Sequence, residues 1–288
     1  MRRALQRVGL EPTNVTPILG GWANWTFDLD GMHIVRFPRT DSVALATHRE
    51  LLLLPELAQA MSFEVPVPTH VATHRHRPFF AYRRIAGAAL GSLDATERIA
   101  LAPAIGRLVA ELHAFPVSRA AALLRLGSPQ HVWWRGFEEL WTLVEEVALP
   151  ELAPATADEV RRRYAAIVDD PPDIPVTLVH DDLGPEHLLV DGDPAGRCRL
   201  ALIDFEDATV GDPAVDLTFL AHDLGVDALP ALVAGRDLGE RLGERFSFYR
   251  WMGSVHAVVY GVTQGDEVER RAGIVELPRR LAAPPLLA

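Results

Sequence analysis

The chain has 288 residues, of which 49% are hydrophobic and 23% charged, and its formal net charge is −11. This length suffices for one large domain or two lobes around a buried core, and the acidic balance argues against nucleic acids and anionic membranes as partners. No apolar run reaches the roughly 20 residues of a membrane span, and the first residues lack the apolar core of a signal peptide. We therefore expect a cytoplasmic protein.

Two composition features limit the chemistry further. All 28 basic residues are arginine, because the sequence contains no lysine, so any phosphate contact that a kinase makes through lysine must here come from arginine. The single cysteine, Cys198, excludes an internal disulfide and a zinc site built from several cysteines.

The predicted elements begin with a small β-rich region. Residues 1–17 form an amphipathic lead-in, and residues 18–38 alternate on both sides of Asp30-Gly31, which predicts two strands around a turn. Gly20-Gly21 ends the first strand, where backbone amides without a neighbouring Cβ can approach a phosphate, although an ordinary turn is the alternative. Asn24 is a candidate to cap this loop.

Helical spacing follows over residues 44–60, where Pro55 is expected to kink or end the first segment. Residues 65–68 and 78–85 are the further expected strands. The apolar period then changes to 3.6, which predicts helices over 95–115, 131–149 and 156–168. The second of these carries Glu138 and Glu145, which form either a solvated face or an acceptor site for an amine.

The clearest chemical pattern lies at residues 178–217. Two apolar strand-like runs, 176–179 and 200–203, end directly in Asp181-Asp182 and Asp204. A carboxylate at a strand end is held by a rigid backbone and points into an open cleft, so two of them can share a divalent metal and a triphosphate. His187 follows Asp182 by five residues, the interval between base and metal ligand in the kinase catalytic loop. This pattern predicts phosphoryl transfer.

Four more helices are expected after this stretch, over 213–223, 229–234, 238–262 and 267–281. His256 and Tyr260 lie one turn apart on the third and are candidates to approach an acceptor.

The ordered motifs His180-x-Asp182, Gly184-Pro185, His187, Ile203-Asp204-Phe205 and Gly211-Asp212-Pro213-x-x-Asp216 resemble the signature of the aminoglycoside and macrolide phosphotransferases. The macrolide enzymes are the more similar, because they share the run around Val35-Arg36. The resemblance implies an α+β, bilobal, protein-kinase-like fold. A small antiparallel β-sheet lobe with one main helix would span residues 1–86, with a hinge near 81–87, and a larger, mostly helical lobe would span 87–288.

The resemblance also implies roles for individual residues. Asp182 would align the acceptor hydroxyl and take its proton late, while Asp204 and His187 would hold Mg²⁺; His187 replaces the commoner Asn, and magnesium prefers oxygen ligands. Arg36 would take the place of the phosphate-binding lysine, and Glu50 would orient it. A solvated strand edge for Arg36 and a solvated helix face for Glu50 are the alternatives.

Further residues support these in the family pattern. Ala81, Tyr82 and Arg83 would belong to the linker whose backbone reads the purine edge. His180 would brace the catalytic loop, and Asp212 and Asp216 would bond to backbone amides around Pro213. Asp181 stands where relatives usually have Gly; it either extends an acidic patch toward a cationic acceptor or meets solvent.

The implied activity is transfer of the γ-phosphate of GTP or ATP to a hydroxyl of an aminoglycoside, macrolide or nucleoside antibiotic by a monomer or homodimer. Bulky residues near Phe80 and Tyr82 favour GTP. Two alternatives remain: a metabolic kinase of the same fold, acting on a sugar, choline-like or amino-alcohol acceptor, and a catalytically silent nucleotide-binding module.

Overall fold

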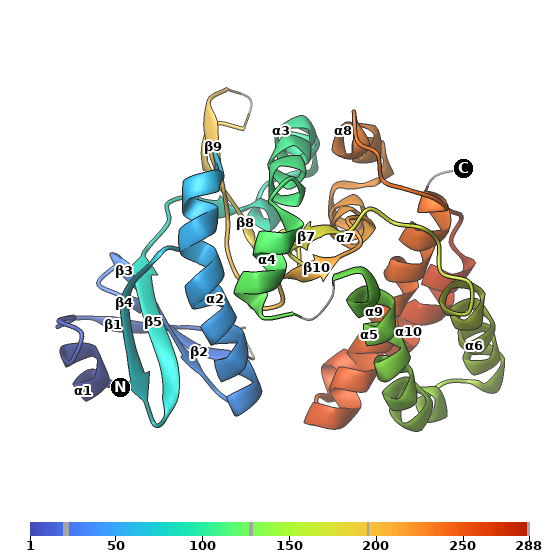
Figure 1. The fold of residues 1–288 in the computed structure, drawn as a ribbon, viewed down its shortest axis with the longest axis horizontal. Coiled ribbons are helices and arrows are strands. Elements are labelled where there is room, and N and C mark those ends of the chain that lie inside the picture. Colours follow the sequence, from blue (N-terminus) through green and yellow to red (C-terminus); the bar gives the residue numbers. More distant parts are fainter. Residues whose placement is uncertain (20–22, 127–128, 195, 287–288) are drawn as a thin grey trace.

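The protein is described by a computed structural model that covers residues 1–19, 23–126, 129–194 and 196–286, without side-chain detail at 129–132. Figure 1 shows a small lobe built on a sheet at one side and a mostly helical lobe at the other. This arrangement confirms the predicted fold of an antiparallel sheet lobe followed by a larger helical lobe.

The small lobe is a five-stranded antiparallel sheet in the order β1-β2-β3-β5-β4. Its elements are α1 (Arg2–Gln6), β1 (Val15–Ile18), β2 (Asn24–Leu29), β3 (His33–Pro38), α2 (Asp41–Ala60), β4 (Pro68–His74) and β5 (Arg77–Arg83). The predicted turn between β2 and β3 is confirmed, with Asp30 and Gly31 both at positive φ (56° and 70°). Helix α2 packs on one face of the sheet and α1 on the other.

Two local predictions for this lobe are wrong. The sheet starts at Val15, inside the expected lead-in. Residues 65–67 are not a strand, because Pro66 and Pro68 cannot donate to a ladder and β4 starts only at Pro68. Of the two outcomes expected at Pro55, a kink or an end of the helix, the end does not occur, because α2 continues to Ala60. A proline inside a helix costs about 3 kcal/mol, and α2 offsets this by burying Leu53, Leu54 and Leu57 completely, each worth roughly 1.5–3 kcal/mol.

The large lobe contains most of the helices. They are α3 (Ala95–His113), α4 (Val117–Leu124), α5 (Pro129–Leu143), the π-helix η2 (Val144–Ala148), α6 (Pro154–Val168), α7 (Ala214–Leu224), α8 (Leu229–Val233), α9 (Leu242–Gln264) and α10 (Glu267–Ala282), with short 3₁₀ turns η1 (Leu90–Ser92), η3 (Leu149–Glu151) and η4 (Val226–Ala228). Helix α3 begins at a capping box formed by Asp94 and Glu97. Among the helices described, none alone is long and apolar enough to cross a membrane; α3 and α4 meet that test only jointly, across a 74° bend.

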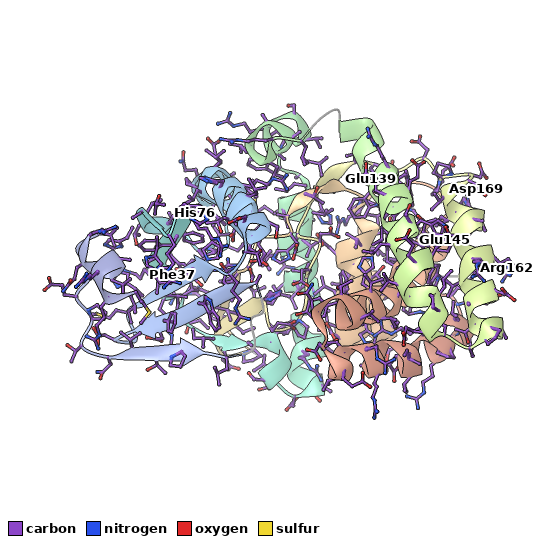
Figure 2. The ribbon with its side chains drawn as sticks, turned by 90° about the horizontal axis from the view of Figure 1, so that it is seen from below. Phe37, His76, Glu139, Glu145, Arg162 and Asp169 are labelled. Atoms are coloured by element: carbon purple, nitrogen blue, oxygen red, sulfur yellow. The ribbon has the colours of Figure 1, made fainter. Side chains whose placement is uncertain are left out.

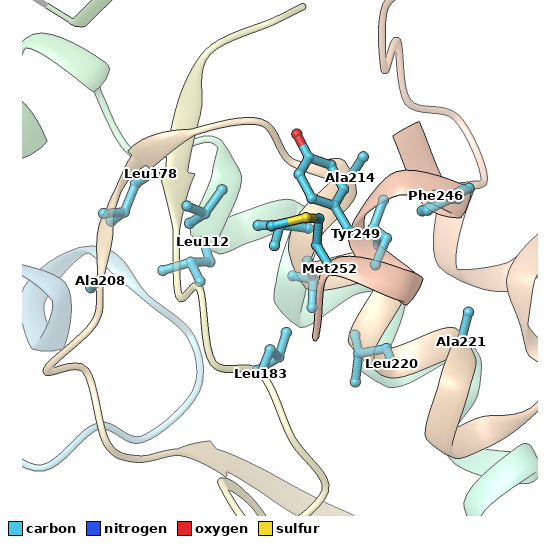
Figure 3. Packing of buried hydrophobic residues seen from close by; sticks show 14 of the residues in the cluster. Leu112, Leu178, Leu183, Ala208, Ala214, Leu220, Ala221, Phe246, Tyr249 and Met252 are labelled. Atoms are coloured by element: carbon cyan, nitrogen blue, oxygen red, sulfur yellow. The ribbon is translucent and has the colours of Figure 1, made fainter. Parts of the chain in front are cut away.

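Two small antiparallel sheets position the segments between the helices. Strand β7 (Thr177–Val179) pairs with β10 (Thr209–Gly211), and β8 (Leu188–Gly192) pairs with β9 (Cys198–Leu202) and with β6 (Ala88–Ala89). The segments 180–187 and 203–208 therefore leave these strands close together. Their floor is the apolar core, in which Leu178, Leu183, and Tyr249 and Met252 of α9 are buried in one cluster (Figure 3).

Candidate active site

A cavity of about 1670 Å³ opens between the lobes. From the small lobe, the sheet and α2 line it. From the large lobe, the segments 180–187 and 203–208 and the helices α5, α9 and α10 line it. The lining includes nine predicted site residues: Asn24, Arg36, Tyr82, Asp181, Asp182, His187, Asp204, His256 and Tyr260. The structure thus gathers residues more than 200 positions apart in the chain around one space.

Asp216 fixes the backbone at the start of the segment 180–187. Its buried carboxylate accepts the amides of His180 and Asp181 at 3.0 and 2.9 Å, and His113 of α3 donates from Nε2 at 2.8 Å. Burial lowers the pKa of His113, so the ring is neutral, and Arg236 contacts its other nitrogen. This network holds the loop by bonds to backbone amides, as the sequence motif predicts for Asp216.

Asp181 has a left-handed backbone, with φ of 65°. This conformation favours glycine, which accounts for the usual residue at this position in the family pattern. Burial, and after it the charges of Asp216, Asp207 and Asp182, raise the pKa of Asp181 well above its ordinary range. Asp181 is therefore an unfavourable residue for folding at the base of the cavity.

Asp182 and His187 lie against each other at the cavity wall. His187 Nδ1 lies 2.7 Å from the Asp182 carbonyl oxygen, an acceptor, so Nδ1 carries the proton and Nε2 is left with a lone pair. Nε2 lies 3.8 Å from Asp204 Oδ2, and Nδ1 lies 3.6 Å from Asp182 Oδ2. Asp182 and Asp204 therefore face the same space with His187 between them.

Asp204 follows β9 in a left-handed conformation, with φ of 68°, and its carboxylate meets Arg36 from the small lobe. Arg36 donates to Asp204 Oδ1 at 2.6 Å, to Glu206 Oε2 at 2.6 Å and to Glu50 Oε1 at 2.7 Å. The predicted pairing of Arg36 with Glu50 of α2 is present. Asn24 adds a bond to Glu206 at 2.7 Å, so β2 and β3 are both tied to the segment that carries Asp204.

The site holds more negative than positive charge. Arg36 lowers the pKa of Asp204 against the effect of burial. Desolvation inside the cleft chiefly, with the neighbouring carboxylates, raises the pKa of Asp182 to about 6 and that of Glu206 to about 7, and it also raises the pKa of Asp207. Such mutual repulsion indicates a site suited to a further cation.

These residues fit a magnesium ion. Carboxylate oxygens of Asp204 and the lone pair on His187 Nε2 face the cavity, and the raised pKa values reflect uncompensated carboxylates. Within the described part of the chain no three His, Cys, Asp or Glu side chains form a complete metal cluster. Mg²⁺ commonly takes only one or two protein ligands and completes its shell with phosphate oxygens and water, which agrees with this set.

The remaining motif residues are structural in their contacts. His180 Nε2 lies 2.9 Å from the Ile203 carbonyl oxygen and so braces the two segments against each other. Asp212 accepts the amide of Ala214 at 2.8 Å and the Tyr249 hydroxyl at 2.8 Å, and it pairs with Arg245 in the core. Both residues hold the loops, as predicted.

Several predicted residues do not reach the cavity. Ala81 is buried on the other face of the sheet and Arg83 is exposed, because side chains alternate along β5; Arg84, Ile85 and Gly87 line the cavity instead. Glu138 is exposed on α5 and is not part of the lining. Glu145 is exposed on η2, where Figure 2 labels it, and is not part of the lining either. Gly20 and Gly21 lie outside the described residues.

Five acids that the sequence motifs do not single out line the cavity, and the first of them, Glu186, lies on the same loop as Asp182. Glu206 and Asp207 follow Ile203-Asp204-Phe205 directly and line the cavity, and Asp266 and Glu269 at the start of α10 line it from the large lobe. Glu206 and Asp207 could have been found from the sequence, because they directly follow the motif Ile203-Asp204-Phe205. The second pair has no sequence signal, because only the packing of α10 on α9 brings it to the cavity.

Comparisons with known proteins show which family the chain matches. Residues 14–249 match the model of a family described as "Phosphotransferase enzyme family". A viomycin phosphotransferase of Streptomyces vinaceus is 27% identical over 209 residues, which make up 68% of each chain.

Two solved structures share the fold over nearly the whole chain. The GDP and kanamycin complex of APH(2")-IIia is 25% identical, with a TM-score of 0.85 and 97% of each chain covered. The macrolide 2'-phosphotransferase MphH from Brachybacterium faecium is 26% identical, with a TM-score of 0.69 and 97% of each chain covered.

Proposed function

The chain belongs to the phosphotransferase enzyme family, and on this premise we propose that it is a kinase that transfers the γ-phosphate of GTP or ATP to a hydroxyl of an antibiotic. The observation that carries the proposal is the shared cavity of Asp182 and Asp204, with His187 within 4 Å of both carboxylates. Two strand-end carboxylates around one space supply both an acceptor for the hydroxyl proton and a place for the donor phosphates.

Asp182 is the proposed base. Its exposed carboxylate is free to accept a hydrogen bond from the acceptor hydroxyl and to align that oxygen with the γ-phosphorus, after which it takes the proton late. A pKa of about 6 leaves the group mostly ionised at neutral pH yet basic enough to receive a proton.

Arg36, Asp204 and His187 are the proposed donor-binding residues. Asp204 and His187 Nε2 would hold Mg²⁺, which when bound supplies positive charge to the β- and γ-phosphates. The Nη2 group of Arg36 would donate to phosphate oxygens in place of Asp204 and Glu206, while Nη1 would remain bonded to Glu50. A planar guanidinium can make these contacts in parallel, so the absence of lysine is no obstacle.

We favour GTP as the donor. The relative at TM-score 0.85 is a GDP complex, and the buried ring of Tyr82 lines the cavity beside the linker residues 84–87. The donor is a nucleotide of the cytoplasm, which is where we place the reaction.

The acceptor class rests on the relatives, which are a viomycin, a kanamycin-binding and a macrolide enzyme. A metabolic alcohol acceptor is the second candidate, because the catalytic residues do not distinguish it. The part of the cavity lined by His256, Asp266 and Glu269 favours an acceptor that carries an amine.

The test is nucleotide consumption by the purified protein with Mg²⁺, measured with GTP and with ATP against peptide, aminoglycoside and macrolide antibiotics and against sugars, choline and amino alcohols. Turnover with antibiotics and a mass gain of one phosphoryl group on the antibiotic support the proposal. Turnover only with simple metabolites supports the second candidate, and nucleotide binding without any turnover contradicts both.

A further inference from the structure

A second cavity, of about 260 Å³, lies on the outer face of the small-lobe sheet. Trp25 and Phe37 are opposite each other on β2 and β3, one residue away from the pair formed by Thr26 and Arg36. Because successive side chains of a strand point to opposite faces, Arg36 lines the interlobe cleft and Phe37 lines the second cavity. The two cavities are thus separated by the thickness of the sheet.

The floor of the second cavity is aromatic. Phe37 contacts Phe27 edge-on at 6.4 Å between ring centroids, His74 edge-on at 5.7 Å, and Phe79 in a stack at 4.5 Å. Trp25 is 56% exposed beside them. A ring left this open on a folded surface offers a stacking partner to a planar ligand.

Arginines surround this floor. Arg39 lies over the Trp25 ring at 4.0 Å, and its buried Nε has no hydrogen-bond partner in the described part of the chain. Arg77 is already occupied by Asp41 at 2.7 Å and by the carbonyls of Pro38 and Arg39. Of the residues described, none forms an ion pair with Arg39 or Arg75, so two guanidiniums remain for a ligand.

Arg75 is held at the rim by a strained turn. The β4–β5 hairpin turns at Arg75 and His76, with φ of 48° and 62°. Turns of this kind favour Asn-Gly, and a left-handed backbone costs roughly 1–2 kcal/mol for each ordinary residue. Backbone strain of this type is common at ligand-binding sites. Here the strained residues are Arg75 and His76, and Arg75 lines the cavity.

The charge of the chain is also divided unevenly. Residues 1–86 contain ten arginines and seven carboxylates, whereas residues 87–288 contain eighteen arginines and thirty-two carboxylates. The small lobe is therefore net positive in an acidic protein, and an anion is attracted to this end of the molecule.

We propose that the second cavity binds a small aromatic anion. The ring would stack on Trp25 and Phe37, and a phosphate or carboxylate group would lie between Arg39 and Arg75, where bidentate guanidinium contacts are available. The volume is just below the usual range of about 300–1,000 Å³ for ligand pockets, so one substituted ring is the expected size.

The test is calorimetric titration of the whole protein with phenyl phosphate, benzoate, inorganic phosphate and phenol. Phenyl phosphate or benzoate should bind in a one-to-one complex. Inorganic phosphate lacks the aromatic ring and phenol lacks the anionic group, so each of them should bind more weakly. A stronger response to phenyl phosphate than to benzoate would identify the phosphate as the natural anion, and the reverse would identify the carboxylate.

Variants separate this cavity from the interlobe cleft. Arg39→Gln with Arg75→Gln should weaken phenyl phosphate binding by roughly tenfold or more, and Trp25→Leu should also weaken it. Arg83→Gln, which removes an exposed charge from the same lobe, and Arg84→Gln, which removes an exposed charge that lines the cleft, should leave it unchanged. Equal binding by the Arg39/Arg75 variant with an unchanged thermal melting curve, loss of binding in Arg84→Gln alone, or no binding by the native protein at millimolar ligand would overturn the proposal.

Discussion

Arg36 is the residue on which the electrostatics of the cleft depend. It is almost fully buried and is shared by Glu50, Asp204 and Glu206, and these charges keep its pKa raised although burial alone would lower it. One permanent cation thus compensates three carboxylates from two lobes. Its loss affects folding through Glu50 and donor binding through the cleft.

We predict that Arg36→Gln destabilises the protein by about 3–5 kcal/mol, because a buried carboxylate is left unpaired, and that it also weakens nucleotide binding. Adding Glu50→Gln should restore much of the stability but none of the affinity. Denaturant unfolding and nucleotide titration measure the two effects. Recovery of affinity in the double variant would show that Arg36 acts only as a partner of Glu50.

The side chain of Asp182 is half exposed, whereas that of Arg36 is buried. We therefore expect a change at Asp182 to affect turnover and not stability. Asp182→Asn should leave nucleotide affinity nearly unchanged and reduce turnover by about 10²–10⁴-fold, the usual contribution of a positioned base. The measurement is kcat beside the nucleotide dissociation constant. Unchanged turnover would exclude Asp182 as the base, and Glu186→Gln, at a neighbouring acid on the same loop, is the control.

Asp181 could not be explained from the sequence, because the chain does not reveal that its φ is positive. Its folded-state pKa is raised, so the protonated form costs nothing below the unfolded pKa and the penalty grows as pH rises toward neutrality. Asp181→Asn should therefore be more stable than the native protein at pH 7 and equal to it in strong acid.

Asp181→Gly should gain roughly a further 1–2 kcal/mol at every pH, because it also removes the left-handed strain. Unfolding free energies measured from acid to neutral pH separate the two contributions. A gain in Asp181→Asn that does not change with pH would mean that the carboxyl is not desolvated in the folded protein.

Helix α7 is the element that positions the loop of residues 180–187, which carries the proposed base, through a single carboxylate near its start. Asp216 links His113 of α3 to the two amides that precede Asp182. The motif around Pro213 predicts contacts to backbone amides, but neither the partner helix nor the bond to His113 is visible in the sequence, since they depend on the packing of α3 against β7 and α7.

Asp216→Asn should cost about 1–3 kcal/mol for each amide left without an acceptor, and it should lower kcat more than it raises the KM for nucleotide, because the loop that carries Asp182 loses its anchor. Thr218→Val on the same helix, which removes only a bond to the Ala214 carbonyl, should leave kcat unchanged. A loss of stability without any change in kcat would mean that Asp216 does not position the loop.

The boundaries of elements are predicted less well than the elements themselves. Strand β4 begins later than expected because Pro66 and Pro68 cannot donate to a ladder, and β1 begins earlier than expected. Helix α2 continues through Pro55, because burial of Leu53, Leu54 and Leu57 outweighs one proline. The order of the large-lobe helices is predicted, with the exception of α4, because their apolar period is long and regular.

The whole molecule follows the predicted plan: a β-rich small lobe, a helical large lobe and a family confirmed by the match over residues 14–249. The spacing of the motifs is sufficient to predict the family and the fold, because phosphoryl transfer needs acids in a fixed order along the chain. The residues around the proposed acceptor are not predictable in the same way. Glu138 and Glu145 carry the charge pattern but face solvent, whereas Asp266 and Glu269 reach the cavity only through the packing of α10.

The most direct test of the central claim is a crystal structure of the protein with Mg²⁺ and a GTP analogue that cannot be hydrolysed. The account predicts the metal on Asp204 and His187, Arg36 on the phosphates, and the terminal phosphate directed toward the carboxylate of Asp182. A nucleotide bound outside the space shared by Asp182 and Asp204, or a metal held by neither Asp204 nor His187, would contradict it.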